Sequence, residues 1–247
     1  MIELQHLHKA FGKKVVLKDV NLTLPDGQSL VVIGGSGTGK SVLLKCILGL
    51  VKPDGGTITI DGKPAGEERE EFLSHFGMLF QGAALFDSLT VWQNVAFRLL
   101  RGPQRRSRKE ARDIAIDKLK RVGMGPEVAD LFPAELSGGM QKRVGLARAI
   151  AADPKVIFFD EPTAGLDPIM SGVINKLIRS IVTEMGATAI TITHDMTSVR
   201  EIADQVTMLH EGVLRWQGSV ADLKTTDDPY VTQFINGRAE GPITALR

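Results

Sequence analysis

Eight consecutive residues have the types and the spacing of a phosphate-binding loop. They are Gly34, Gly35, Ser36, Gly37, Thr38, Gly39, Lys40 and Ser41, which fit the pattern G-x-x-x-x-G-K-[ST]. Glycines let backbone N–H groups surround a phosphate, and the N-terminus of a following helix adds positive charge. Lys40 would neutralise β- and γ-phosphates, and the Ser41 hydroxyl would bind Mg²⁺. The pattern predicts a nucleoside triphosphate site; the alternative is a glycine-rich turn without a ligand.

Two adjacent carboxylates follow a strongly apolar segment later in the chain. The run Val156-Ile157-Phe158-Phe159 predicts a buried strand, and Asp160 and Glu161 come directly after it. A carboxylate at a strand terminus can hold Mg²⁺, usually through water. A second carboxylate beside it can polarise an attacking water, as hydrolysis requires. The alternative for Glu161 is a charge at a helix start before Pro162.

A second helix start rich in serine and glycine lies between these two motifs. The sequence Leu136-Ser137-Gly138-Gly139-Met140 predicts a helix capped by Ser137, whose first N–H groups could face an anion. Two such anion sites would be redundant within one molecule. They are understandable if this element binds the γ-phosphate of ATP held by another copy.

The composition limits the class of protein that positions these groups. The chain has 247 residues, 43% hydrophobic and 24% charged, with a net charge of +1 and one cysteine, Cys46. This supports a well-packed core, gives no general attraction to nucleic acid or anionic membranes, and excludes an internal disulfide. The first residues do not have the pattern of a signal peptide, and no apolar run approaches the ~20 residues of a membrane helix, so we expect neither feature. We therefore expect a soluble, cytoplasmic protein that reaches a membrane only through a partner.

The predicted elements alternate in a way that places the motifs at strand ends. Alternating apolar residues predict antiparallel strands in the first thirty residues, and helical patterns begin near residue 88. Buried strands at 29–33, 156–159 and 188–193 alternate with helices, which predicts a parallel α/β sheet with ligands at the carboxyl ends of its strands. A terminal hairpin is expected around 206–216. We interpret the basic run 101–109 as a solvated loop rather than a nucleic-acid or lipid-headgroup site.

Taken together, the chain resembles the ATP-binding-cassette (ABC) ATPases over nearly its whole length. Six motifs occur in the family's order: Walker A at 34–41, the Q-loop Gln81, the signature 136–140, Walker B at 156–161, the D-loop 165–167 and the switch histidine His194. The resemblance implies an α/β fold of the ABC-type P-loop ATPases. This fold has a RecA-like parallel-sheet core, an N-terminal antiparallel β subdomain and an inserted α-helical subdomain. The expected bounds are 1–87 and 155–225 for the core with the β subdomain, 88–154 for the helical subdomain, and 226–247 for a C-terminal extension.

The same resemblance implies how the nucleotide is held. It implies a head-to-tail homodimer with two ATP molecules, each between the Walker A loop of one copy and Ser137, Gly138 and Gly139 of the other. Phe11 stands where the family has an aromatic ring, usually Tyr, that stacks on adenine; from position alone it would be an ordinary core contact. Asp167 is expected to join the nucleotide-binding residues.

The resemblance also implies the catalytic set. Glu161 is expected to activate the water, Gln81 to join the Mg²⁺ and water shell, and His194 to contact the γ-phosphate. Ser41, Gln81 and Asp160 are therefore the expected Mg²⁺ ligands. The other histidines, His6, His8, His75 and His210, lack the grouping of metal ligands, and we interpret them as structural.

One departure from the family pattern points to a narrower group. Most family signatures place Gln after the two glycines, whereas Met140 stands there and Gln141 follows. This signature, the segment 79–90 and the tail 228–242 are similar to the Mla/Mce group of lipid-transport ATPases. That similarity implies phospholipid transport between the inner and outer membranes of a Gram-negative-type bacterium, where it maintains lipid asymmetry.

The implied partners are a second copy, an integral-membrane permease, a small accessory cytosolic subunit and a periplasmic Mce-type lipid-binding component, without nucleic acid. The implied location is the cytoplasmic face of the inner membrane. Two alternatives stay open at this point. The first is the ATPase of a small-solute importer, for example for an amino acid. The second is a non-transport ABC ATPase of DNA repair or translation.

Overall fold

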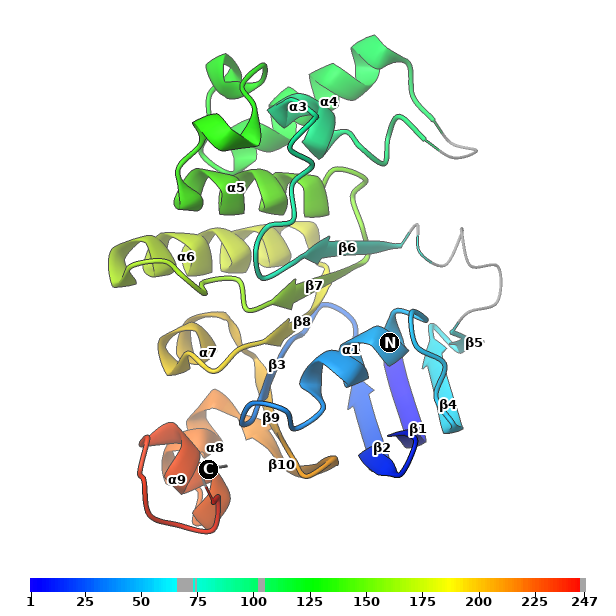
Figure 1. Ribbon diagram of the computed structural model, residues 1–247, viewed down its shortest axis with the longest axis vertical. Coiled ribbons are helices and arrows are strands. Elements are labelled where there is room, and N and C mark those ends of the chain that lie inside the picture. The colour runs from blue at the N-terminus through cyan, green and yellow to red at the C-terminus, as the bar shows by residue number, and fades with distance from the viewer. Residues whose placement is uncertain (66–72, 74, 102–104, 245–247) are drawn as a thin grey trace. The chain divides into compact units, whose positions relative to one another are not determined.

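The computed structural model describes residues 1–65, 73, 75–101 and 105–244. The chain forms two compact units, Met1–Phe72 with Ile192–Arg247 and Leu73–Thr191 (Figure 1). Both units combine strands with helices, so the predicted mixed α/β class is confirmed. In the part of the chain that the structure describes, no helix is long and apolar enough to cross a membrane. The narrower domain bounds at 88–154 and 226–247 stay predictions.

The first unit contains the expected antiparallel sheet. Its strand order is β2-β1-β4-β5, with β1 at Ile2–Phe11, β2 at Lys14–Leu24, β4 at Gly55–Ile60 and β5 at Lys63–Pro64. Alternation places one side of each long strand in the core: Ile2 and Leu4 of β1 are buried, as are Leu22 and Leu24 of β2. The pairing of β1 with β2 is antiparallel but irregular between Leu4 and Ala10, where the register shifts.

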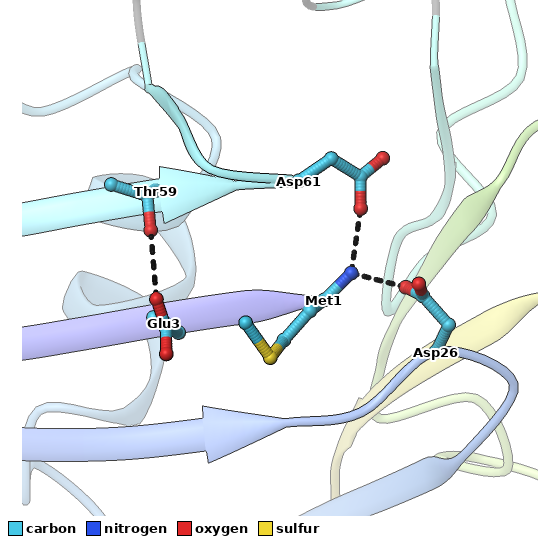
Figure 2. Close-up of polar contacts among 5 residues, drawn as sticks. All are labelled: Met1, Glu3, Asp26, Thr59 and Asp61. Carbon is cyan, nitrogen blue, oxygen red and sulfur yellow. Dashed lines mark hydrogen bonds and ion pairs between the residues drawn. The ribbon is translucent and has the colours of Figure 1, made fainter.

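Polar contacts fasten one end of this sheet (Figure 2). The amino group of Met1 forms ion pairs with the carboxylates of Asp26 and Asp61, the latter at 2.6 Å. The Thr59 hydroxyl donates to the Glu3 carboxylate at 3.4 Å, across the β1–β4 pair. These exposed and half-exposed pairs set the start of β1 against the turns that follow β2 and β4.

Parallel strands of the same unit carry the phosphate-loop candidate. Strand β3 at Ser29–Ile33 is buried at every residue and pairs in parallel with β9 at Gln205–His210. The predicted terminal hairpin is present, because β9 pairs antiparallel with β10 at Val213–Ser219. The described residues of this unit also form the helices α1 at Lys40–Ile47, α7 at Met196–Ile202, α8 at Val220–Thr225 and α9 at Pro229–Ile235. Cys46 of α1 is buried, and burial raises the pKa of its thiol.

The second unit packs helices against three of the six strands of the larger sheet (Figure 1). Its strands are β6 at Phe76–Leu79, β7 at Val156–Asp160 and β8 at Thr188–Ile192, in the order β8-β7-β6. Its helices are α3 at Val91–Val95, α4 at Arg108–Arg121, α5 at Gly138–Ala149 and α6 at Pro168–Met185, with the 3₁₀ turns η1 at Pro126–Val128 and η2 at Pro133–Glu135. Phe158 and Phe159 of β7 are fully buried, which anchors the strand that ends in the acidic pair.

Side chains cap helix starts in both units. Ser137 caps α5 by accepting a hydrogen bond from the Met140 amide, as predicted, and at the start of α3 the Gln93 side chain accepts the Thr90 amide at 3.0 Å. Asp228 caps α9 with Pro229 in its first turn. Residues 102–104 of the basic run lie outside the described residues. Next to them, the Arg101 guanidinium lies 3.7 Å from the centre of the Phe97 ring.

Candidate functional site

The loop between β3 and α1 has the backbone that its glycines predict. Gly34 adopts φ +148°, Gly37 +74° and Gly39 +105°, all in the region that favours glycine. A Cβ at Gly34 would lie 2.2 Å from the carbonyl oxygen of Leu209, and one at Gly39 would lie 3.0 Å from that of Val16. Neighbouring backbone therefore fits tightly against the loop and leaves no room for side chains at these two positions.

Side chains of the loop fold back onto its own carbonyl groups. The Lys40 ammonium donates to the carbonyl oxygens of Gly34 and Gly35, each at 2.7 Å. The Thr38 hydroxyl donates to the carbonyl of Gly35 at 2.9 Å. The ammonium group thus lies over the loop, in the position from which a lysine can meet a phosphate. Ser36, Gly37 and Ser41 are exposed, so the rim of the loop and the start of α1 are open to a ligand.

Phe11 lies at the end of β1 with half of its surface exposed. The Lys9 ammonium is 5.2 Å from its ring centre and also pairs with Asp54 at 2.8 Å. A ring this exposed contributes little to the core, and this favours the expectation that it stacks on a base. Its contact with a nucleotide stays a prediction.

His194 is exposed and lies between two anchored neighbours. The Thr193 amide donates to the carbonyl of Val32 in β3 at 3.4 Å. Asp195 caps α7, accepting from the amides of Thr197 and Ser198 and from the Ser198 hydroxyl. Burial raises the pKa of Asp195, but these hydrogen bonds outweigh it and leave the pKa below its usual value. The loop around His194 is therefore held at both sides.

In the second unit, the acidic pair ends the strand as predicted. Asp160 is the last residue of β7, and Glu161 follows it; both side chains are half-buried. Glu161 has φ +46°, a left-handed conformation that is uncommon for a residue other than glycine, asparagine or aspartate. Its carbonyl accepts the amide of Ala164 at 3.1 Å, which closes a turn before α6. The strained backbone at Glu161 is what one expects of a functional position rather than of a plain helix start.

The other predicted positions of this unit lie at element ends. Gln81 is exposed shortly after β6. Ser137 and Gly138 are exposed at the start of α5, whereas Gly139 is buried and a Cβ there would lie 2.7 Å from the terminal methyl of Met170. Asp167 caps α6 by accepting from the amides of Ile169 and Met170. The signature motif thus presents Ser137 and Gly138 outward.

Two cations that the sequence analysis did not single out contact the Q-loop. The buried Lys142 of α5 donates to the carbonyl oxygens of Gln81 and Glu161. Arg148, on the same helix, donates to the carbonyls of Ala83 and Ala84. A signal existed in the sequence, because both cations stand in a helix that is otherwise rich in apolar and small residues. Their partners are backbone atoms, which no sequence pattern reveals.

Side chains that commonly bind metal ions are not clustered in the described part of the chain. Among the described residues, no three or more His, Cys, Asp or Glu side chains are grouped so that they could hold a metal ion. A divalent cation held mainly by phosphate and water oxygens needs only one or two protein ligands and is compatible with this observation.

The sequence of the chain matches one protein family over more than half its length. Residues 17–164 match the family model described as ABC transporter, a range that runs from β2 through the acidic pair. The chain belongs to the ABC transporter family. As a member of that family it is an ATP-binding ATPase, so the expected enzyme class is confirmed.

Curated ABC proteins align with this chain nearly end to end. It is 43% identical to the "Probable ribonucleotide transport ATP-binding protein mkl" of Mycobacterium tuberculosis, over 98% of this chain and 68% of that protein. It is 41% identical to "Protein TRIGALACTOSYLDIACYLGLYCEROL 3, chloroplastic" of Arabidopsis thaliana, over 98% and 75%. It is 37% identical to the "Intermembrane phospholipid transport system ATP-binding protein MlaF" of Escherichia coli K12, over 98% and 91%. The narrower Mla-type resemblance is thereby confirmed.

A solved ABC structure agrees with the fold. The dimeric, post-hydrolysis ATP-binding cassette MJ0796, bound to ADP and Pi, matches with a TM-score of 0.80 at 31% identity, covering 89% of this chain and 99% of that one. At this identity the likeness extends beyond the fold to the ABC ATPase class.

Proposed function

We propose that this ABC ATPase hydrolyses ATP to drive phospholipid transport by a membrane permease. The observation that carries the hydrolytic step is the strained Glu161 beside Asp160 at the end of β7. A nucleotide binder needs one carboxylate near its metal, whereas hydrolysis also needs a base for water. The acidic pair supplies both.

The phosphate-binding residues are those of the loop at 34–41. The N–H groups of Gly34 through Gly39 and the N-terminus of α1 would receive the β- and γ-phosphates, with Lys40 as the neutralising cation. Phe11 would stack on adenine. The loop geometry supports this role, because the loop has a backbone conformation in which a side chain at Gly34 or Gly39 would collide with neighbouring backbone.

Mg²⁺ fits the donor set of these residues. Ser41, Gln81 and Asp160 provide hydroxyl, amide and carboxylate oxygens, which are the hard ligands that Mg²⁺ prefers, and each is exposed or half-buried. The ion would neutralise charge on the β- and γ-phosphates. These three residues would hold and orient it, with phosphate and water oxygens completing its coordination.

In the hydrolytic step, Glu161 accepts a proton from water as the water oxygen bonds to the γ-phosphorus. The bond from that phosphorus to the bridging β–γ oxygen breaks, which yields ADP and inorganic phosphate. His194 donates a hydrogen bond to the γ-phosphate, and Gln81 orients the attacking water. Ser137, Gly138 and Gly139 of a second copy provide further N–H groups, and Asp167 contributes from the D-loop.

The dimeric part of this proposal rests on similarity. The cassette MJ0796 is dimeric in its post-hydrolysis state, and 89% of this chain aligns with it. ATP would bridge the Walker A loop of one copy and the signature of the other. It would therefore stabilise the closed dimer, and hydrolysis would reopen it.

The lipid substrate is supported by relatives that align nearly end to end. MlaF is named for intermembrane phospholipid transport, and the chain covers 91% of it. The Arabidopsis protein bears the name of a galactolipid, trigalactosyldiacylglycerol. We propose that this chain acts on the cytoplasmic face of the inner membrane with a permease, a small accessory subunit and a periplasmic Mce-type lipid carrier.

One observation favours a second candidate. The mycobacterial relatives at 43% identity are named for probable ribonucleotide transport, a small-solute substrate. Both candidates use the same ATPase residues, so the ATP site does not separate them. A non-transport role in DNA repair or translation has no comparable support. The mycobacterial protein and MlaF are named for transport, and the Arabidopsis protein is named for a galactolipid.

Purification of the native complex separates the candidates. The tagged chain would be isolated in mild detergent from its own membranes, and the copurified permease would be analysed for bound small molecules by mass spectrometry. Phospholipid enrichment over the bulk membrane, together with ATPase stimulation by phospholipid, is the expected result. Enrichment of ribonucleotide, with stimulation by ribonucleotide alone, would overturn the lipid assignment. Stimulation by DNA or ribosomes without a permease would overturn transport itself.

A further inference from the structure

Lys142 is a buried cation that contacts two functional segments. The residue is 5% exposed, and its ammonium donates to the carbonyl oxygen of Gln81. The same ammonium reaches the carbonyl oxygen of Glu161 at 3.5 Å, the long end of the hydrogen-bond range. One side chain of the signature helix α5 therefore contacts both the Q-loop and the backbone of the proposed base.

The face of α5 that carries Lys142 contacts the Q-loop and the end of β6. Lys142, Gly145 and Arg148 are spaced by three residues and so lie on one side of the helix. A Cβ at Gly145 would lie 2.7 Å from Leu79 and 3.2 Å from Ala83, so the helix backbone approaches the end of β6 closely. Arg148 then holds the carbonyls of Ala83 and Ala84. Donors and close packing along this face hold the Q-loop turn.

The backbone segments held in this way are strained. Ala83 has φ +58°, Ala84 +47° and Glu161 +46°, and none of the three is glycine. Such conformations persist only where surrounding contacts enforce them. Lys142 and Arg148 of α5 donate hydrogen bonds to the carbonyl groups of these three residues and of their neighbour Gln81. These donors therefore help to hold the backbone in its unusual conformation.

The charge of Lys142 has local compensation. Burial lowers the pKa of its ammonium, and the nearby carboxylates of Asp160 and Glu161 oppose that lowering. A cation here also attracts the two carboxylates toward α5. The Lys142 ammonium thus holds the Q-loop through a hydrogen bond and attracts the acidic pair electrostatically.

We propose that Lys142 is a positioning residue for hydrolysis, which ties the signature helix to the Q-loop at Gln81 and to the backbone at Glu161. It touches neither ATP nor water in this proposal. It keeps Gln81 and Glu161 in the geometry that the reaction needs and makes them move together with Ser137. The proposal rests on the assigned roles of Gln81 and Glu161.

The test is a set of substitutions in the full-length protein, assayed in the purified transporter complex. Lys142→Met removes the charge and keeps the length of the side chain. Its kcat for ATP should fall about 10- to 100-fold with KM changed less than about threefold, because misplacement of reacting groups by about 1 Å has costs of this size. Lys142→Arg keeps a cationic donor and should recover at least a third of the lost kcat.

A matched control is available in the same unit. Lys118 of α4 is 6% exposed and pairs with Asp153, away from the Q-loop and the acidic pair. Lys118→Met removes the ammonium of a lysine that is buried to nearly the same degree, and it should lower the melting temperature while kcat stays within about twofold of wild type. Hydrogen exchange adds a direct readout: the amides of residues 81–84 and of Glu161, Thr163 and Ala164 should exchange faster in Lys142→Met and at the wild-type rate in Lys118→Met.

The outcomes separate this inference from the proposed function. Wild-type kcat in Lys142→Met, equal losses in both Met variants, or a change in KM alone would each overturn the positioning role. Failure of Lys142→Arg to recover any activity would do so as well. If Glu161→Gln itself hydrolysed ATP at the wild-type rate, the assigned base would be wrong and the proposed function would fail first. If kcat were low in Glu161→Gln but at the wild-type level in Lys142→Met, the positioning role of Lys142 would be refuted while the proposed function would stand.

Discussion

The α-carbon of Gly34 faces the carbonyl oxygen of Leu209, which would lie 2.2 Å from a Cβ at that position. Gly34 also has φ +148°, a conformation that is open almost only to glycine. Gly34→Ala should therefore lower the free energy of unfolding by about 1–3 kcal/mol from backbone strain alone and weaken ATP binding. Urea unfolding and ATP titration measure the two effects.

Gly172→Ala is the control: it stands in α6 with open space around it and should stabilise the protein by about 0.5–1 kcal/mol. A Gly34→Ala variant with wild-type stability and affinity would contradict this account of the loop.

Glu161→Gln should bind ATP and fail to turn it over. The amide keeps the shape of the side chain but cannot accept a proton from water, so kcat should fall by about 10²–10⁴-fold with ATP affinity retained. The uncleaved nucleotide should hold two copies together, which light scattering with ATP would detect as a stable dimer. Hydrolysis at the wild-type rate would show that another group is the base.

Mixing two inactive variants tests whether the site is shared between copies. Lys40→Ala should lose most ATP affinity, because it removes both the phosphate cation and the ammonium that binds the carbonyls of Gly34 and Gly35. Ser137→Arg should block the signature of the variant copy itself, and so the ATP site on the loop of its partner copy, while leaving its own loop intact. A mixed dimer then contains one complete site, so combining the two variants should restore part of the ATPase activity. No recovery, with mixed dimers present by cross-linking, would argue against shared sites.

Asp195→Ala should destabilise the protein by about 1 kcal/mol at pH 7, because α7 loses its N-cap next to His194. The pKa of Asp195 is lower in the folded protein, so the unfolded chain binds more protons at acidic pH. The carboxylate of Asp195 therefore makes its full contribution to the free energy of unfolding at pH values above the unfolded pKa of about 3.9. That contribution is lost as the pH falls through the pKa of the folded protein. Thermal unfolding from pH 7 to pH 3 should show the wild-type and Ala curves converging at the acid end. Asp195→Asn keeps a capping oxygen and should be intermediate at pH 7; a constant gap down to pH 3 would contradict the titration.

Much of this protein could be predicted from local sequence, because its motifs are continuous. The loop at 34–41, the acidic pair after 156–159 and the Ser137 cap each combine special backbone needs with a short spacing, so neighbouring residues largely dictate their conformation. Strand alternation in β1 and β2 predicted the antiparallel pairing in the same way. The register shifts of β1 and the positive φ of His6 and Asp19 were not predicted, since bulges depend on the opposing strand.

Contacts between segments distant in sequence required the folded chain. Lys142 lies 61 residues from Gln81 and 19 from Glu161, and its acceptors are backbone carbonyls that every residue possesses. No periodicity or composition selects one carbonyl among so many. The same is true of the carbonyl of Leu209 that excludes a side chain at Gly34. Residue types and spacing thus specify which chemistry the chain can perform, because that chemistry belongs to short motifs. Only tertiary packing decides which backbone groups hold those motifs in place, because that choice depends on where distant segments meet.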